Sequence, residues 1–156
     1  MNVLSEISST FQLMFRRPKR TQYAALCYRR TKKDGQLEIL LLTSRDTGRW
    51  VIPKGWPMGS KAGYTVAETE ALQEAGVKGI VEHDPLGCFG YGKAMPEGLV
   101  LPCEVQVHAM EVTGSVKNFK EKGERKLEWV SPQAAAERVA EPGLKKIILT
   151  FAKRES

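Results

Sequence analysis

The sequence predicts an α/β fold in which helices flank a central mixed sheet. Two observations support this prediction. Apolar runs of strand length recur from residue 23 to residue 130, separated by turn signals, and amphipathic helical stretches follow residues 65 and 131. With 156 residues, of which 42% are hydrophobic, the chain is about one domain long and can bury one core. We therefore expect a single domain over residues 22–156, preceded by an arm or docking helix over residues 1–21.

The N-terminal arm is expected to have two parts. Its second part, the basic run at residues 16–20, is most simply a solvated arm before the first strand. In its first part apolar side chains recur at near-helical spacing, which favours a docking helix, a partner-binding segment or a contact within a homodimer. A mitochondrial-type presequence is a weaker alternative. The apolar residues of the first part are Val3, Leu4, Ile7, Phe11, Met14 and Phe15.

The first strands are expected to form a hairpin. They cover residues 23–29 and 37–43, and Asp34-Gly35 between them is typical of a tight turn. Residues 50–52 form a third, short strand, which Pro53 ends.

A glycine-rich loop and a short helix come next. Glycines at 55, 59 and 63, together with Pro53 and Pro57, indicate a shaped backbone that can approach a ligand closely. Thr65 and Glu68 have the spacing of a capping box, so the helix is expected to begin near residue 66. Gly76 suits the left-handed position that ends a helix.

This helix carries two acids on one face. Glu70 and Glu74 are four residues apart, with Gln73 beside them, and their like charges repel by roughly 0.2–0.5 kcal/mol in an isolated helix. A hard cation such as Mg²⁺ would compensate, because it prefers carboxylate oxygens. The simpler alternative is a solvated helix face that includes Glu68, Glu70 and Glu74.

The second half of the chain contains further strands and two helices. We expect strands at residues 77–82, 86–91, 99–112 and 126–130. The charged, aperiodic residues 114–124 are expected to form a mobile loop. Ser131 and Pro132 predict a helix start, as cap and first-turn residue. A last helix is expected from Pro142, with one apolar face made of Leu144, Ile147, Ile148 and Phe151.

Composition narrows the class of partner. The net charge of +6 favours anionic partners such as nucleotides, inositol phosphates, nucleic acid or acidic lipid. Nucleic acid is the minority interpretation, because no stacking aromatics are interleaved with the basic run. The chain has no apolar run of about eighteen residues and no secretory signal, so we expect a soluble, cytoplasmic protein without a membrane span. Cys27, Cys88 and Cys103 are expected to be reduced and mostly buried.

The stretch from Gly55 to Val77 resembles the box of the Nudix hydrolases, G-x5-E-x7-R-E-U-x-E-E-x-G-U, where U is aliphatic. Matching positions are Gly55, Glu70, Glu74, Gly76 and Val77, with Ala71 as a small apolar substitute. Together with "RWVIPKGWPMG" and "LEWVSPQAA", the box makes residues 22–140 similar to bacterial members of the diphosphoinositol-polyphosphate and dinucleoside-polyphosphate branch. The resemblance implies a Nudix-type α/β/α sandwich.

The box is partly degenerate. Lys61 replaces its first glutamate, Thr69 its arginine and Gln73 the first acid of its final pair. In the family the arginine helps to hold the loop and the acids through ion pairs, and Thr69 cannot make such a bidentate contact. Gln73 can coordinate a metal through its amide oxygen, but it is not a base near neutral pH.

The resemblance implies metal-dependent hydrolysis of a phosphoanhydride bond, in this chain slow. The substrate would be a nucleoside diphosphate derivative, a dinucleoside polyphosphate or an inositol pyrophosphate. Mg²⁺, with Mn²⁺ as a substitute, would lie on Glu70 and Glu74 with the backbone carbonyl near Gly55. Because Gln73 cannot act as a base, a water-orienting acid is expected from the loop, namely Glu121 or Glu124. The alternative is a degenerate Nudix module that binds a phosphorylated ligand or partner without turnover.

Basic residues around the loop are candidates for phosphate contacts. The candidates are Arg45, Arg49, Lys54 and Lys93, for each of which a solvated surface position is an equal alternative. Two tryptophans are candidates for base stacking or core packing, with core packing favoured for Trp50 and left open for Trp56.

Overall fold

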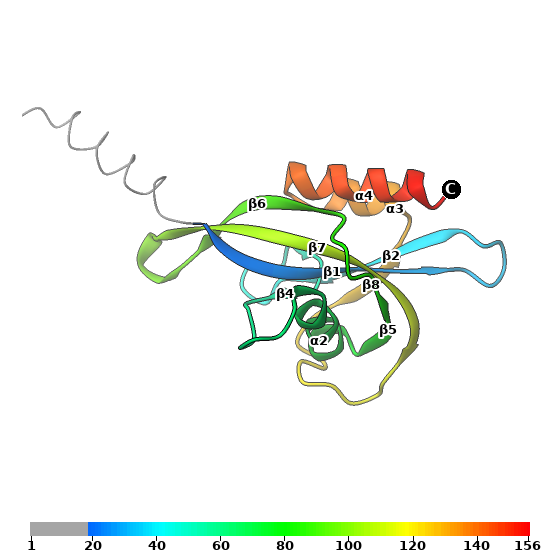
Figure 1. Ribbon diagram of the computed structural model, residues 1–156, viewed down its shortest axis with the longest axis horizontal. Helices are drawn as coiled ribbons and strands as arrows, with labels where there is room; N and C mark the ends of the chain where they lie inside the picture. Colours follow the sequence, from blue (N-terminus) through cyan, green and yellow to red (C-terminus); the bar gives the residue numbers. More distant parts are fainter. Residues whose placement is uncertain (1–18) are drawn as a thin grey trace, which may run out of the picture.

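The computed structural model describes residues 19–156. The predicted docking helix and basic run therefore lie outside the described residues, except for the last positions of the arm. Arg20 and Thr21, assigned to the arm from sequence, already belong to the first strand. Within the described part, the strands form one sheet with helices on both faces, which confirms the predicted α/β class (Figure 1).

Strands β1 (Arg20–Arg30) and β2 (Leu37–Thr43) form the predicted antiparallel hairpin, with Tyr28 opposite Ile39. Its turn closes through Gly35, whose φ of 67° lies in the left-handed region. Strand β8 (Leu127–Val130) pairs with the edge of β2 that faces away from β1, and β3 (Trp50–Val51) pairs with the end of β2 on the opposite edge. These four elements confirm the predicted strands, with ends that shift by up to three residues.

The sheet is mixed because β1 runs parallel to the long strand β7 (Val100–Ser115). Two antiparallel neighbours pair with β7 in succession, β6 (Gly87–Ala94) along its first half and β5 (Val77–Val81) along its second half. The β6–β7 connection is a 3-10 turn, η1 (Pro96–Gly98). A two-residue strand that the sequence analysis missed, β4 (Lys54–Gly55), pairs with β1 at Tyr23 and Ala24.

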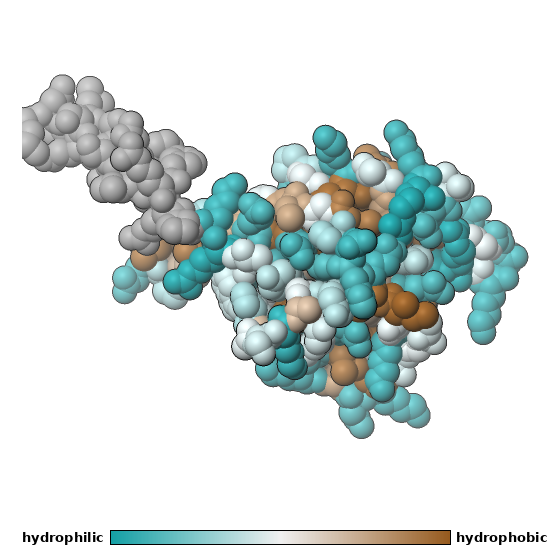
Figure 2. Space-filling model, viewed as in Figure 1, coloured by the Kyte–Doolittle hydropathy of each residue, from teal (hydrophilic) through white to brown (hydrophobic). Residues whose placement is uncertain are grey.

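Helices cover the sheet as two layers. Helix α2 (Gly63–Ala75) lies on one face, and α3 (Pro132–Arg138) with α4 (Pro142–Arg154) lies on the other (Figure 1). Alternate residues of β1 point to opposite faces, so Leu26 joins the core below α4 whereas Ala25 joins the core below α2. The view in Figure 2 shows a mostly hydrophilic surface with hydrophobic residues in small, separate patches.

The start of α2 differs from the prediction. The helix begins at Gly63, its N-cap is Ala62 without a side-chain cap, and Thr65 lies inside the first turn, so the capping-box assignment was wrong. The first helical position is tightly packed, because a Cβ on Gly63 would stand 2.5 Å from the ring of Tyr23. The predicted end is confirmed: Gly76 has φ 68° and its N–H donates to the Leu72 carbonyl at 3.0 Å.

The C-terminal helices agree with the sequence analysis. The Ser131 hydroxyl accepts a hydrogen bond from the Ala134 N–H at 3.1 Å, so Ser131 caps α3 as predicted. On α4, the predicted apolar face packs into the core, and its fully buried members are Leu144, Ile148 and Phe151.

The segment between β7 and β8 is packed, not a free loop. The Val116 N–H donates to the Gly76 carbonyl at 2.8 Å, and the Glu121 N–H donates to the Gln73 carbonyl at 2.9 Å. Both bonds attach the segment to the C-terminal end of α2. The ring of Phe119 lies so close to Gly76 that no side chain would fit there. The predicted mobility of residues 114–124 does not agree with these contacts.

The cysteines and the membrane prediction can also be compared with the structure. Cys27 and Cys103 are buried thiols as expected, and Cys88 is exposed. All three are free of disulfide bonds. Within residues 19–156 no helix is long and apolar enough to cross a membrane.

Candidate active site

A cavity of about 550 Å³ lies where the β4 loop, α2 and the segment between β7 and β8 meet. It brings together most of the residues proposed from sequence: the acids Glu70, Glu74 and Glu121, the amide Gln73, the glycine Gly55 and the cations Arg45, Lys54 and Lys93. Two proposed residues, Arg49 and Glu124, do not line it. Residues not proposed for phosphate or metal contacts also line it, among them Asp46, Trp56, Lys120 and Arg125.

Gly55 and Glu70 define the floor of the cavity. Gly55 is fixed by the pairing of β4 with β1, and Glu70 reaches it from the middle of α2. A Cβ placed on Gly55 would stand 2.3 Å from the Glu70 Oε1, so any residue larger than glycine would displace the carboxylate. The glycine is therefore required by the close approach of a carboxylate to the backbone.

Glu74 is the buried acid of the site, with 4% of its surface exposed. Its Oε2 accepts a hydrogen bond from the Lys54 backbone N–H at 3.3 Å. Burial raises the pKa of Glu74 to about 8, and a side-chain hydrogen bond with Glu70 acts in the same direction. The guanidinium of Arg125 opposes both effects. A cation bound beside Glu74 would favour its ionised form.

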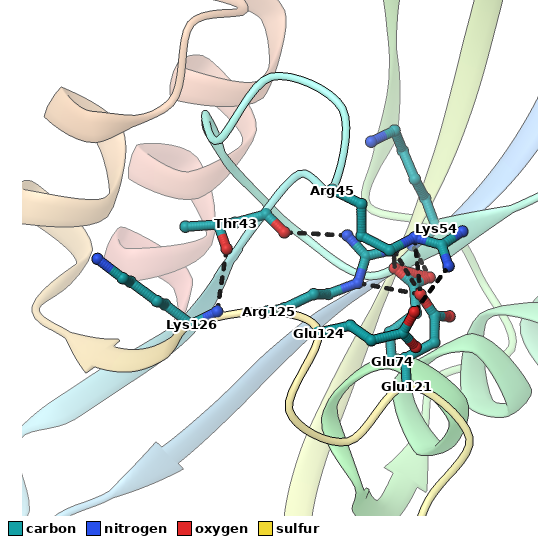
Figure 3. A network of polar contacts seen from close by, with 8 residues as sticks. All are labelled: Thr43, Arg45, Lys54, Glu74, Glu121, Glu124, Arg125 and Lys126. Carbon is teal, nitrogen blue, oxygen red and sulfur yellow. Dashed lines mark hydrogen bonds and ion pairs between the residues drawn. The ribbon is translucent and has the colours of Figure 1, made fainter.

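Arg125 is the site residue that the sequence analysis missed. Its Nη2 lies 2.9 Å from the Glu121 Oε1 and 3.3 Å from the Glu74 Oε1, and its Nη1 donates to the Thr43 carbonyl at 3.0 Å (Figure 3). Only 10% of its side chain is exposed. The i, i+4 spacing of Glu121 and Arg125 was the one signal in the sequence, but the contacts with β2 and α2 are long-range.

The two acids of the segment between β7 and β8 have different surroundings. Glu121 is 8% exposed, and its Oε1 also lies 3.3 Å from the Nε of Arg45. The side chain of Glu124 is 46% exposed and pairs with the Nη1 of Arg45 at 3.4 Å, outside the cavity wall (Figure 3). Of the two candidate water-orienting acids, Glu121 alone lines the cavity.

The basic residues proposed from sequence for phosphate contacts also differ in their positions relative to the cavity. Lys54 lies in the cavity with its Nζ 5.3 Å from the ring centre of Tyr91, and burial lowers the pKa of its ammonium. Lys93 also lines the cavity, and its Nζ lies 5.8 Å from the ring centre of Trp56. Arg49, in contrast, pairs with Glu141 at 3.6 Å and does not line the cavity that holds Glu70, Glu74 and Glu121.

Two of the positions that depart from the Nudix box lie away from the carboxylates. The Thr69 hydroxyl donates to the Thr65 carbonyl at 2.8 Å, one turn back on α2. Lys61 is exposed before the helix begins. The third, Gln73, lines the cavity and its backbone carbonyl holds Glu121.

The donors at the cavity floor suit a hard divalent cation. They are all oxygens: the carboxylates of Glu70 and Glu74, the amide of Gln73 and the backbone at Gly55. The absence of a side chain at Gly55 lets the Glu70 carboxylate lie close to that backbone. Mg²⁺ typically takes one or two carboxylates and completes its shell with water and substrate phosphate. Residues 19–156 contain no group of three or more His, Cys, Asp and Glu side chains arranged to hold a metal by themselves. The residues present therefore fit a minimal metal site.

Comparisons with known proteins concern the fold and the sequence as a whole. No family model matches the chain. Two curated relatives from Arabidopsis thaliana are Nudix hydrolase 12, mitochondrial, with 29% identity over 65% of this chain and 52% of the relative, and Nudix hydrolase 13, mitochondrial, with 28% identity over 67% and 54%. The chain thus spans about half the length of the curated relatives it matches.

Solved structures show the same architecture at low sequence identity. A C. elegans Ap4A hydrolase aligns with a TM-score of 0.65 and 15% identity, over 89% of this chain and 100% of that chain. The E. coli dihydroneopterin triphosphate pyrophosphohydrolase aligns with a TM-score of 0.65 and 16% identity, over 87% and 97%. The chain therefore has the Nudix fold, and its sequence is similar to those of Nudix hydrolases.

Proposed function

We propose that the chain is a metal-dependent hydrolase of a phosphoanhydride bond. One observation carries the proposal: Glu70 and Glu74 meet on α2 against Gly55, at the floor of a cavity that also exposes cationic side chains. The cationic side chains are Arg45, Lys54, Lys93 and Lys120. An acidic floor for a cation, combined with basic walls for phosphate oxygens, is the arrangement that a pyrophosphate substrate requires.

Mg²⁺, or Mn²⁺ in its place, is the proposed cofactor. Glu70 and Glu74 would hold the ion, with the Gly55 carbonyl and the Gln73 amide as neutral donors. When bound, the ion supplies Lewis acidity toward the phosphate oxygens. Lys54 and Lys93, which line the same cavity, would neutralise the remaining phosphate charge.

Glu121 is the proposed acid that orients the attacking water. Gln73 cannot accept a proton near neutral pH, and Glu124 lies outside the cavity wall. Within the described part of the chain, the ion pairs of Glu121 all involve its Oε1. Its Oε2 is then the oxygen left to accept a hydrogen bond from water. If this is right, Glu121→Gln lowers kcat much more than Glu124→Gln does, whereas equal kcat values would contradict it.

Trp56 favours a nucleotide over an inositol pyrophosphate as the substrate. The residue lines the cavity, is 37% exposed and belongs to neither core cluster, so core packing does not account for its ring. A planar base could stack on it, a contact worth roughly 1–3 kcal/mol. Two solved structures of this fold, named as an Ap4A hydrolase and as an NrtR Nudix domain complexed with ADP ribose, support a nucleoside derivative as the ligand.

Substituting Trp56 tests the stacking. Trp56→Ala is expected to raise KM for nucleotide substrates about fivefold or more, since it removes a stacking contact. Trp56→Phe keeps an aromatic face and is the matched control. An equal rise in KM for a diphosphoinositol polyphosphate, which has no base, would contradict the assignment.

A second candidate is a module that binds a phosphorylated ligand without turnover. The neutral Gln73 and the contact of Arg125 with Glu74 favour it, because both reduce the negative charge available to a metal. Product release from a panel of ADP-ribose, dinucleoside polyphosphates, nucleoside triphosphates and a diphosphoinositol polyphosphate separates the candidates. Metal-dependent release that Glu74→Gln abolishes supports the hydrolase. Ligand binding without release from any substrate supports the module.

A further inference from the structure

We infer that Arg125 is a built-in cation of the carboxylate cluster, by which we mean Glu70, Glu74 and Glu121, and that it limits the site to one divalent ion. The inference rests on the proposed function in one respect, the assignment of Glu70 and Glu74 as metal ligands. The place of Arg125 among the carboxylates is independent of that assignment, because it follows from the contacts of the side chain.

The guanidinium of Arg125 is fixed from three directions. Its Nη1 donates to the Thr43 carbonyl at the end of β2, at 3.0 Å. Its Nε and Nη2 both donate to the Glu121 Oε1, at 3.2 and 2.9 Å. The same Nη2 lies 3.3 Å from the Glu74 Oε1 on α2 (Figure 3). With 10% of its side chain exposed, Arg125 has little freedom to leave the cluster.

The charges of the cluster leave room for one divalent ion. Four acids line the cavity, Asp46, Glu70, Glu74 and Glu121, and five basic residues line it as well, Arg45, Lys54, Lys93, Lys120 and Arg125. The protein's own cations therefore already match its carboxylates in number, and a first divalent ion makes the site positive. A second ion would add positive charge to a partly buried site, where like charges repel more strongly than in water.

Geometry leads to the same conclusion. The two acids proposed to hold an ion lie beside β4, with Glu70 against Gly55 and the Oε2 of Glu74 accepting from the Lys54 N–H. The other oxygen of Glu74, Oε1, already has a cation, the Arg125 guanidinium, which Glu74 shares with Glu121. Arg125 therefore occupies the space in which a second ion could use both Glu74 and Glu121.

Counting bound ions tests the inference without using activity. We would titrate the folded, metal-free protein with Mn²⁺ and follow free Mn²⁺ by electron paramagnetic resonance. The expected result is one bound ion per chain. Arg125→Met should bind a second ion or bind the first roughly tenfold more tightly, because a positive charge close to the ligands has gone.

Two control variants distinguish charge from shape. Arg125→Lys keeps a cation at the cluster and should still bind one ion. Arg45→Met removes an arginine that contacts Glu121 but is 53% exposed and lies outside contact with Glu74, so its effect should be smaller. Circular dichroism establishes first that each variant is folded.

Two or more ions bound to the unsubstituted chain would overturn the inference, and this measurement needs no variant. Unchanged or weaker Mn²⁺ binding in folded Arg125→Met would also overturn it. One bound ion without hydrolysis of any substrate would support the inference while the proposed hydrolase fails. Absence of Mn²⁺ binding would overturn both, since the metal assignment they share would be wrong.

Discussion

The two faces of the sheet are built from different side chains. Under α4 the helix contributes large apolar residues, and Phe151 packs edge-to-face on Tyr28 with ring centres 4.9 Å apart. Under α2 the helix contributes small ones, Ala67, Ala71 and Ala75. Small residues let a helix lie close to a sheet, and the neighbouring acids of α2 then reach the backbone of β4. The comparison indicates that the α4 face holds the larger apolar side chains of the core, whereas α2 carries the acids of the proposed site.

The largest expected effect is on activity at the α2 face. Glu74→Gln should lower kcat/KM by roughly 100-fold or more, because a metal ligand that stabilises charge in the transition state is lost. The variant should still fold, because the neutral amide avoids the unfavourable burial of a charge. Steady-state kinetics with thermal melting as the control would check both statements. A fully active Glu74→Gln variant would contradict the assignment of activity to the acids of α2.

Truncation on the α4 face should affect stability instead. Phe151 is 1% exposed, and Phe151→Ala is expected to lower the free energy of unfolding by about 3–5 kcal/mol. Urea denaturation measures that change. At a temperature where the variant remains folded, its Mn²⁺ affinity should equal that of the unsubstituted chain. A large loss of Mn²⁺ affinity in the folded variant would show that the two faces are not independent.

Restoring an acid to the box should increase turnover. Gln73 lines the cavity, so Gln73→Glu adds a carboxylate that can bind metal or accept a proton, and kcat should rise about tenfold or more. The substitution distinguishes a weak enzyme from a binding module, because a module should stay inactive. Gln133→Glu, on the exposed surface of α3, is a matched control for the added charge.

The last expected effect is a pH dependence of stability in the metal-free protein. Burial raises the pKa of Glu74 to about 8 from its ordinary value of 4.5, so the folded state holds a proton that the unfolded state releases between these values. This contribution to stability is fully present below pH 4.5 and is lost as the pH rises through about 8. Thermal melting should show the loss between pH 5 and 9.

Glu74→Gln is the control for the pH dependence. It removes the titrating group, so the slope of melting temperature against pH should flatten. Mg²⁺ added at the alkaline end should restore stability, because metal binds the ionised carboxylates of the folded state. An identical slope in Glu74→Gln would show that another group is responsible.

Much of the fold could be predicted because its signals are local. The hairpin of β1 and β2, the cap at Ser131 and the helix end at Gly76 all depend on residues within a few positions of one another. The early start of α2 could not be predicted, since its N-cap, Ala62, provides no side-chain cap and the contact of Gly63 with the Tyr23 ring is long-range. Strand β4 is too short, and too close to prolines, to carry a strand pattern.

In the candidate site, too, some residues could be predicted from the sequence and others could not. The acids Glu70 and Glu74 could be predicted because the spacing along one helix places them together. The role of Arg125 could not, since its partners Thr43 and Glu74 are far from it in the sequence. Arg49 was proposed for its nearness to the loop in sequence, but it pairs with Glu141 instead.

The central claim is that water attacks phosphorus at a metal site formed by α2. The most direct measurement is hydrolysis of ADP-ribose or a dinucleoside polyphosphate in H₂¹⁸O, with and without Mg²⁺, followed by mass spectrometry of the products. The account predicts ¹⁸O in a phosphoryl product only when Mg²⁺ is present, and none with Glu74→Gln. Label in a phosphoryl product without metal, or equal label with Glu74→Gln, would contradict it.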